Sequence, residues 1–343
     1  MKCTIPEHEL HRLRTVAAVS RGNKIDEKRQ FVKIESDGTS AKLTGTDGEN
    51  FVSCVIDANG DECSFAIHFS VAERFASGLS DLEVTVNGTS IDYVQGNSSG
   101  NITTVDPDTV PKHSVPDMSD APQFDGDLLI RSLSTAVDCS DKGSTSARFA
   151  LQGAQLKMSG GELVVNGTDG RKAFSVSIDS DSSAEFDVIV PHASLKHMRS
   201  LSRQAIKIKT DASSITLSDG QLVYTCRLVS GRFPDVAKLV NKSDGEQVIS
   251  TDTQSLIQGA ESILWDDDKL VIKGSGLETL DGKRKFSCEL SAEFDPVTVS
   301  YANMKPLISS FDHCVIKSDG GSSPLFIELG DSAVGMIAPI VAN

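Results

Sequence analysis

The sequence predicts an α+β protein in which three related units, each with antiparallel sheets and two helices, follow one another along the chain. Three observations lead to this class. A four-residue motif recurs at a fixed spacing, helix-like apolar periodicity opens the units, and short alternating runs bounded by turn residues follow the helices. The 343 residues are enough for two or three domains.

The internal repeat is clearest in one motif. Gly45-Thr46-Asp47-Gly48 recurs 122 residues later as Gly167-Thr168-Asp169-Gly170, and each copy lies between two short β-type runs. Residues 69–75 align at the same spacing with residues 191–197. A weaker third copy begins at Ser300, 109 residues beyond Pro191. These spacings predict three domains, over residues 1–118, 119–241 and 242–343.

Amphipathic helices are expected at the start of the first two domains. The first helix is predicted over residues 7–19, with Leu10, Leu13 and Ala17 on one face. The second is predicted to have Asp127 as its N-cap. Its apolar face comprises Leu129, Leu133, Ala136 and Val137.

The third domain is expected to be about 13 residues shorter than the others. Its opening helix, around residues 255–260, is followed at once by a strand-like run at 262–265. We therefore expect the third domain to lack the back half of its first helix and the turn after it. Elsewhere, Asp219-Gly220 predicts a hairpin, and linkers are predicted at 107–122 and 241–245.

Composition excludes several classes of protein. The 33 Lys and Arg residues against 48 Asp and Glu residues give a net charge of −15, which excludes a strongly basic nucleic-acid coat protein. Aromatic residues make up 5% of the chain, too few for the stacking platforms of single-strand binders. No membrane-length apolar run or signal segment is present, and the seven scattered cysteines form no C-x-x-C pair. A cytoplasmic protein with buried thiols and no membrane partner is expected.

Motifs for catalysis or for metal binding are weak. Gly96-Asn97-Ser98-Ser99-Gly100 fits the hydrolase elbow G-x-S-x-G, but a strand rather than a helix is expected after it. Residues 57–61 begin like a calcium loop, yet Glu62 replaces the turn glycine. Residues 266–268 are interpreted as a solvated hairpin tip. We therefore predict no enzyme and no cofactor or metal, and a hydrolase using Ser98 remains the rival from another class.

Basic residues give a stronger indication. Around residues 195–202, Leu195, Met198 and Leu201 or Ser202 form an inward stripe. The separate face of this helix presents Lys196, Arg199 and Arg203. Since equivalent helices of a repeat would present their faces along one side, we expect these basic faces to line one side of the array, with ordinary solvated faces as the alternative.

Six segments resemble the β subunit of bacterial DNA polymerase III, the DNA sliding clamp family. The match runs in order along the chain, and its most specific part is Leu228-Val229-Ser230-Gly231-Arg232-Phe233-Pro234-Asp235. The other segments are 43–47, 151–153, 168–172, 188–191 and 337–340.

The resemblance implies three clamp-fold domains per chain and a homodimeric ring, with sheets outside and two helices per domain lining the inside. It implies a non-enzymatic DNA sliding clamp that tethers the replicative polymerase and confers processivity. The implied partners are double-stranded DNA held topologically and without sequence preference, DNA polymerase, the clamp loader and other clamp-motif proteins. A ring is retained by topology, so only its lumen needs positive charge, and the net charge of −15 is compatible with DNA binding.

The resemblance also implies site residues. It places basic DNA contacts at Lys24 and Arg148, and it implies a partner-peptide groove between the second and third domains. Taken with the basic helical faces, it leads us to expect further DNA contacts at Arg21 in the first loop and at Lys196, Arg199 and Arg203. The groove residues would be Leu151, Thr168, Gly170, Arg171, Lys172, Ala173, Pro234, Leu239, Met336, Pro339 and Ile340. The family usually has His-Arg-Leu where this chain has Arg171-Lys172-Ala173, which implies a different peptide preference.

The main rival within the same fold is a clamp-fold binding or regulatory module that does not encircle DNA. The region of the third domain that is shortened in this chain meets the first domain of the partner chain in the family. A native mass equal to that of one chain would therefore favour this rival.

Overall fold

The computed structural model describes residues 1–21, 26–143, 149–201, 204–240, 246–273, 276–287, 295–330 and 332–341. The chain forms two compact units. The first comprises Met1–Gln123 and Ser200–Arg227, and the second comprises Phe124–Arg199 and Leu228–Asn343.

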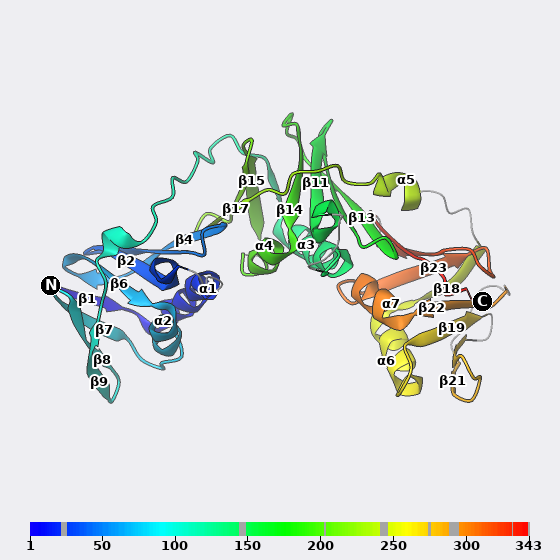
Figure 1. The fold of residues 1–343 in the computed structure, drawn as a ribbon, viewed down its shortest axis with the longest axis horizontal. Helices are drawn as coiled ribbons and strands as arrows, with labels where there is room; N and C mark the ends of the chain where they lie inside the picture. The colour runs from blue at the N-terminus through cyan, green and yellow to red at the C-terminus, as the bar shows by residue number, and fades with distance from the viewer. Residues whose placement is uncertain are drawn as a thin grey trace. The chain divides into compact units, whose positions relative to one another are not determined.

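The first unit contains a five-stranded sheet of order β5-β1-β7-β8-β9 and an eight-stranded sheet of order β10-β15-β16-β17-β4-β3-β2-β6 (Figure 1). Its helices are η1 (Glu7–Glu9), α1 (Leu10–Ser20), η2 (Glu27–Gln30), α2 (Phe69–Phe75) and η3 (Pro107–Thr109). Its strands are β1 (Lys2–Ile5), β2 (Phe31–Asp37), β3 (Ser40–Thr46), β4 (Asn50–Asp57), β5 (Asn59–Gly60), β6 (Glu62–His68), β7 (Leu82–Asn87), β8 (Ser90–Gln95), β9 (Ser98–Thr103), β15 (Ala205–Thr210), β16 (Ser214–Ser218), β17 (Leu222–Arg227) and, where the chain passes into the second unit, β10 (Gln123–Asp125).

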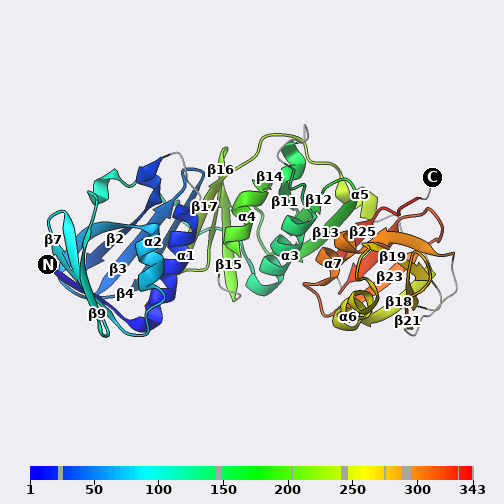
Figure 2. The ribbon, with the colours of Figure 1, turned by 60° about the horizontal axis from the view of Figure 1, so that its bottom comes forward.

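The second unit contains an eight-stranded sheet of order β14-β11-β12-β13-β25-β24-β23-β18 and a four-stranded sheet of order β21-β20-β19-β22 (Figure 2). Its helices are α3 (Gly126–Cys139), η4 (Phe149–Gln152), α4 (His192–Met198), α5 (Val236–Val240), α6 (Thr253–Ile263) and α7 (Tyr301–Ile308). Its strands are β11 (Gly153–Ser159), β12 (Glu162–Thr168), β13 (Lys172–Asp179), β14 (Phe186–Pro191), β18 (Glu246–Asp252), β19 (Lys269–Lys273), β20 (Gly276–Thr279), β21 (Lys285–Phe286), β22 (Val297–Ser300), β23 (His313–Ser318), β24 (Leu325–Leu329) and β25 (Ala333–Ile337).

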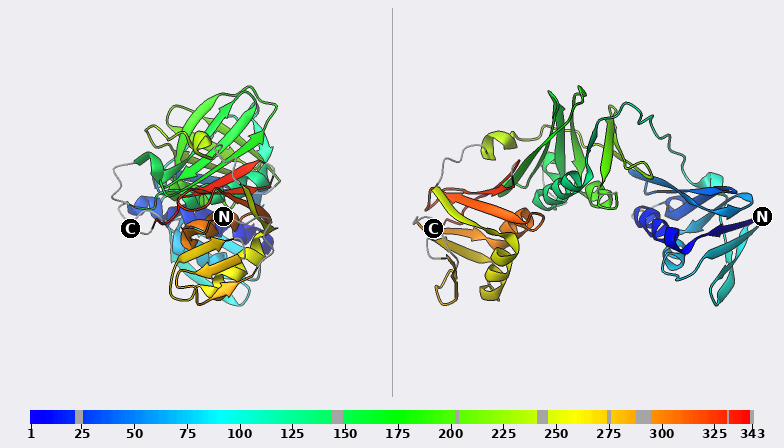
Figure 3. Two further views of the ribbon diagram at one scale, coloured as in Figure 1. Left: turned by 90° about the vertical axis from the view of Figure 1, so that its right-hand side faces the viewer. Right: turned by 180° about the vertical axis from the view of Figure 1, so that it is seen from behind.

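These elements confirm the α+β class with antiparallel sheets. Helices α1 and α2 pack side by side, as do α3 and α4, and α6 contacts α7 (Figures 1 and 3). The division into two compact units reflects the sheets, which the second predicted domain shares with both of its neighbours. That domain contributes β15, β16 and β17 to the sheet of β4, and β11 to β14 to the sheet of β25. The division into three domains, with boundaries near residues 118 and 241, therefore stays a prediction from the sequence repeat.

The first helices form where apolar periodicity places them. Helix α1 buries Leu10, Leu13 and Ala17 against β2, β3 and β4. For α3 the predicted cap is wrong. Asp125, not Asp127, is the N-cap, and its carboxylate accepts a hydrogen bond from the amide of Leu128 at 2.8 Å. Asp125 has the extended backbone of a cap, whereas Asp127 already lies in the first helical turn.

The predicted loss of half a helix in the third domain is wrong. Helix α6 has 11 residues, the same number as α1, and it includes Ser262 and Ile263, which were expected in a strand. Its buried residues Leu256, Ile257, Ala260 and Ile263 repeat with helical spacing, which decides in favour of a helix. The shortening lies in the following turn, since five residues separate α6 from β19 and 13 separate α3 from β11.

The repeated Gly-Thr-Asp-Gly motif encodes a hairpin turn. The hydroxyl of Thr46 donates to the carbonyl of Asn50 and accepts from the amide of Gly48, and Thr168 does the same with Lys172 and Gly170. The following aspartate accepts two backbone amides in each copy. Each copy therefore satisfies the polar groups of its own turn.

The predicted hairpins and linkers are only partly confirmed. The hairpin at Asp219-Gly220 joins β16 to β17, and Gly96 lies in the β8–β9 hairpin, so both are confirmed. Residues 266–268 are not a hairpin tip, because they connect α6 to β19. The 107–122 linker holds η3 and no strand, and the 241–245 linker lies outside the described residues.

Two further findings concern the whole described chain. The six cysteines within it are free and buried, as expected, while Cys288 lies outside it. None of the helices in this part of the chain combines the length and apolar character needed to cross a membrane.

Candidate partner-binding groove and basic residues

A groove of about 790 Å³ opens on the second unit. Three segments form it: η4, the end of β12 with the β12–β13 turn, and the segment from Ser230 into α5. Its lining residues are Phe149, Ala150, Leu151, Thr168, Gly170, Ser230, Gly231, Arg232, Phe233, Pro234, Asp235 and Leu239.

An apolar cluster supports the groove from below. Phe233 is buried in this cluster as well as lining the groove. The amide of Val229 donates to the carbonyl of Ile189 at 2.9 Å, which holds the segment before the groove to the end of β14. The buried cluster comprises Ala173, Ile189, Phe233, Val236 and Val240, with Ala150, Val229, Val334 and Met336 packed against it.

Two large apolar side chains remain exposed at the groove. Phe149 is 63% exposed and Leu239 is 41% exposed. Phe149 also lines a second cavity, of about 330 Å³, next to Pro191 and His192. Exposed apolar side chains over a fixed floor suit a partner with hydrophobic anchors.

Two ion pairs occur at or beside the groove. Asp235 pairs with Lys238 at 2.8 Å and accepts its amide at 3.3 Å, and these interactions lower the pKa of the Asp235 carboxyl. Lys172 forms an ion pair with Asp169, and most of the Lys172 side chain is buried. The charge of Lys172 is thus directed into the turn.

The predicted groove residues fall into two sets. Leu151, Thr168, Gly170, Pro234 and Leu239 line the groove together. The others lie beneath or beside it. Ala173 and Met336 belong to the supporting cluster, and Lys172 pairs with Ile337 across β13 and β25. The carbonyl of Arg171 accepts a hydrogen bond from the amide of Ala338, and the amide of Ile340, which follows Pro339, donates to the carbonyl of Thr298.

Sequence reasoning missed Phe149. An isolated phenylalanine directly after the polar run 140–148 was the available signal. Arg232 and Phe233 belong to the segment that resembles the family, but they were not among the predicted groove residues.

The basic residues expected to face DNA are partly described. Lys196 lies exposed on α4, and the stripe of Leu195, Met198 and Leu201 is buried as predicted. Arg199 caps α4 and lies 3.4 Å from the carboxylate of Asp138. In the first unit, Arg21 ends α1 and pairs with Glu73 of α2. Lys24, Arg148 and Arg203 lie outside the described residues.

One group of potential metal ligands occurs in the described part of the chain. His8, Glu9 and Asp57 each place a ligand atom within 4.8 Å of the others. His8 and Asp57 are exposed, and three donors at a surface form an incomplete coordination shell. We assign no metal to this group.

Comparison with known proteins gives a consistent result. Residues 129–235 match the family model of the central domain of the DNA polymerase III beta subunit. A beta sliding clamp of Chlamydia muridarum is 25% identical over 232 residues, which are 63% of this chain and 61% of that protein. The chain thus spans less than two thirds of that relative's length. The family resemblance predicted from the motifs is confirmed.

Solved structures share the fold over the whole chain. A DnaN sliding clamp from Pseudomonas aeruginosa bound to griselimycin has a TM-score of 0.85 and 16% identity, with 100% of both chains covered. A Helicobacter pylori beta clamp bound to a DNA ligase peptide has a TM-score of 0.82 and 18% identity, covering 99% of this chain and 100% of that one.

Proposed function

We propose that the chain acts as a DNA sliding clamp, because residues 129–235 match the central domain of the DNA polymerase III beta subunit and a beta sliding clamp is 25% identical over 232 residues. The observation that carries the proposal is the likeness of fold to sliding clamps over the whole chain. Two copies would close into a ring around duplex DNA and tether the replicative polymerase. The protein would then act as a processivity factor without chemistry of its own, opened by a separate clamp loader.

Charge supports retention by topology. The net charge of −15 opposes general adhesion to DNA, whereas a closed ring needs positive charge only where it faces the duplex. We assign Lys196 and Arg199 to that face, with Arg21, Lys24, Arg148 and Arg203. Helix α4 buries Leu195 and Met198 and leaves Lys196 exposed, which supports this orientation.

The groove would receive an extended peptide from polymerase, the clamp loader or another clamp-binding protein. Exposed Phe149 and Leu239 would contact apolar anchors of the peptide, while the buried cluster around Phe233 keeps the floor in place. Preorganisation of the floor lowers the entropy cost of binding. With domain boundaries at 118 and 241, the groove's lining residues belong to the second domain, and the third domain contributes Val334 and Met336 of the supporting cluster.

The first test is the native mass by light scattering, followed by retention on DNA. A mass of twice 36.5 kDa is expected. With a matching clamp loader and ATP, the protein should remain on nicked circular DNA and be lost when the circle is linearised. Linear DNA separates topological retention from simple adhesion.

Two results would contradict the ring. A strict monomer at micromolar concentration would favour a clamp-fold regulatory module that does not encircle DNA. Equal retention on circular and linear DNA would show that the protein adheres to DNA without enclosing it.

A further inference from the structure

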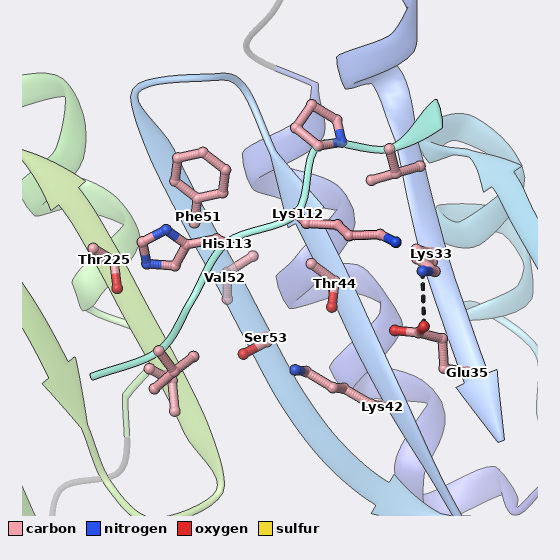
Figure 4. A pocket seen from close by; sticks show the side chains of 14 residues that line it. Lys33, Glu35, Lys42, Thr44, Phe51, Val52, Ser53, Lys112, His113 and Thr225 are labelled. Atoms are coloured by element: carbon pink, nitrogen blue, oxygen red, sulfur yellow. Dashed lines mark ion pairs between the residues drawn. The ribbon is translucent and has the colours of Figure 1, made fainter. Parts of the chain in front are cut away.

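We propose that the first unit binds a small phosphorylated molecule in a cavity of about 290 Å³. The cavity lies between one face of the eight-stranded sheet and the chain segment 110–115, which runs across strands β2, β3, β4 and β17 (Figure 4). This proposal is independent of the clamp function, because it uses neither the groove nor the basic residues assigned to DNA.

Strand alternation explains why polar side chains gather on this face. A Cβ atom added to Gly45 would meet Val16 and Ser20 of α1 at 2.7–2.9 Å, so this position faces the helix. Its neighbour Thr44 therefore points to the opposite face. The strand register then aligns Thr44 with Lys33 on one side and with Ser53 on the other.

The cavity carries an excess of positive charge. Three lysines, Lys33, Lys42 and Lys112, line it, against the single carboxylate of Glu35. The side chain of Lys33 is 9% exposed, and its ammonium group lies 2.7 Å from Glu35 and 3.9 Å from Asp108. Asp108 also pairs with Lys112 at 3.0 Å, at the exposed edge of the site. Glu35 and Asp108 together offset two of the three lysines, and the remaining positive charge favours an anionic occupant.

His113 supplies a second and independent indication. Its ring stacks on Phe51, with centroids 4.5 Å apart, and both side chains line the cavity (Figure 4). The Nε2 atom of His113 is buried and has no hydrogen-bond partner among the described residues. Burial lowers the pKa of His113, so the ring is neutral at neutral pH and able to donate or accept one hydrogen bond. Buried polar atoms are normally paired, and a ligand would provide the partner.

Size and charge together define the ligand class. At about 30 Å³ for each water in the liquid, the cavity has room for roughly ten waters, which suits one phosphate group with a small organic body. A phosphate monoester carries about −1.5 to −2 charges at neutral pH. The site offers it one excess positive charge, because Glu35 and Asp108 offset two of the three lysines. Lys42 and Lys112 with the hydroxyls of Thr44 and Ser53 would hold the phosphate, and Phe51 would contact the organic part.

The test is isothermal titration of the full chain with phenyl phosphate, inorganic phosphate and benzoate. We expect saturable binding of phenyl phosphate, weaker binding of inorganic phosphate, and binding of benzoate that is weaker still. Lys42→Gln and Lys112→Gln should each weaken phenyl phosphate binding at least tenfold. Lys269→Gln, which changes an exposed lysine of β19, should leave it unchanged.

Three results would overturn the proposal. The first is absence of binding at millimolar phenyl phosphate. The second is an affinity for phenyl phosphate in the Lys42→Gln and Lys112→Gln variants equal to that of the parent protein. The third is binding of duplex DNA through the same lysines without binding of the ester. Thermal unfolding of each variant confirms that it is folded. Because Lys42 and Lys112 lie outside the DNA assignment, unchanged loading of these variants on circular DNA separates this site from the clamp function.

Discussion

The ammonium group of Lys172 lies 2.8 Å from Oδ2 of Asp169, and the two side chains are 9% and 18% exposed. Lys172 also donates to the side chain of Asn303 at 3.3 Å. The ion pair links the start of β13 to the repeated turn, and the hydrogen bond to Asn303 links it to α7. The lysine that departs from the family pattern therefore stabilises the second unit and adds little charge to the groove, so peptide preference would depend more on Arg171.

Replacement of Lys172 should reduce stability. Lys172→Met removes one partner of a mostly buried pair, and we expect the free energy of unfolding to fall by about 1–3 kcal/mol. Lys238→Met is the matched control, because Lys238 is 81% exposed in its pair with Asp235. That control should change stability by less than about 1 kcal/mol. Urea denaturation measures both, and equal effects would show that burial of the Lys172 pair has no energetic role.

The repeated glycines should tolerate no side chain. A Cβ atom at Gly167 would lie 2.6 Å from the carbonyl oxygen of Ala136 in α3, and one at Gly45 would lie 2.7–2.9 Å from α1. Gly45→Ala and Gly167→Ala should each destabilise the protein by about 1–3 kcal/mol, because the helix must move away from the sheet. Gly143→Ala is the control, because among the described residues the added atom meets only the flexible carboxylate of Asp141, at 3.1 Å. Unchanged thermal midpoints for Gly45→Ala and Gly167→Ala would contradict the close packing.

The groove should lose affinity when its exposed apolar side chains are shortened. Phe149→Ala and Leu239→Ala should each weaken binding of a labelled polymerase peptide by about tenfold, or about 1.4 kcal/mol. Fluorescence anisotropy measures the affinity. Leu79→Ala, which changes an 88% exposed leucine of the first unit, should have no effect. Since all three side chains are exposed, none of the changes should lower stability, and unchanged peptide affinity would remove the groove assignment.

DNA retention should depend on the face of α4. Lys196→Gln should increase the rate of loss from circular DNA and reduce the slope of log affinity against log salt by about one. Asp138→Asn should do the opposite, because Asp138 pairs with Arg199 at 3.4 Å and offsets its charge. Lys157→Gln, on the exposed side of β11, is the control. If the control and Lys196→Gln behave alike, α4 does not face DNA.

Stability should fall in acid through the aspartates of the turns. The Ser214 hydroxyl and the amides of Ser213 and Ser214 bond to Asp211 and lower its pKa from 3.8 to about 2. Because the folded pKa is the lower one, the stabilisation is complete well above pH 3.8 and is lost as pH falls from 3.8 towards 2. Asp211→Asn should therefore be less stable than the parent at neutral pH, and the difference should shrink in acid. A difference independent of pH would show that the charge of Asp211 is not involved.

Local chemistry made much of the fold predictable. The turn motif at residues 45–48 and 167–170 satisfies its own polar groups, so it could be recognised without knowledge of distant contacts. The buried stripe of Leu195, Met198 and Leu201 follows helical spacing in the same way. The prediction failed at residues 262–265, because a short apolar run fits a strand and the end of a helix equally well. In the structure Ile263 is buried at helical spacing after Leu256, Ile257 and Ala260, so the start of this run belongs to α6.

The sequence by itself determined the repeated turns, the amphipathic helices, the acidic character and the resemblance to the beta-subunit family. Tertiary structure decided which of these residues meet. Phe149, Gly170 and Leu239 share a groove only because η4, the β12–β13 turn and α5 are brought together around a common floor. Phe51 and Thr225 line one cavity because β4 pairs with β17, far away in the chain. Such pairings are set by burial of whole sheet faces, which no local pattern of residues specifies.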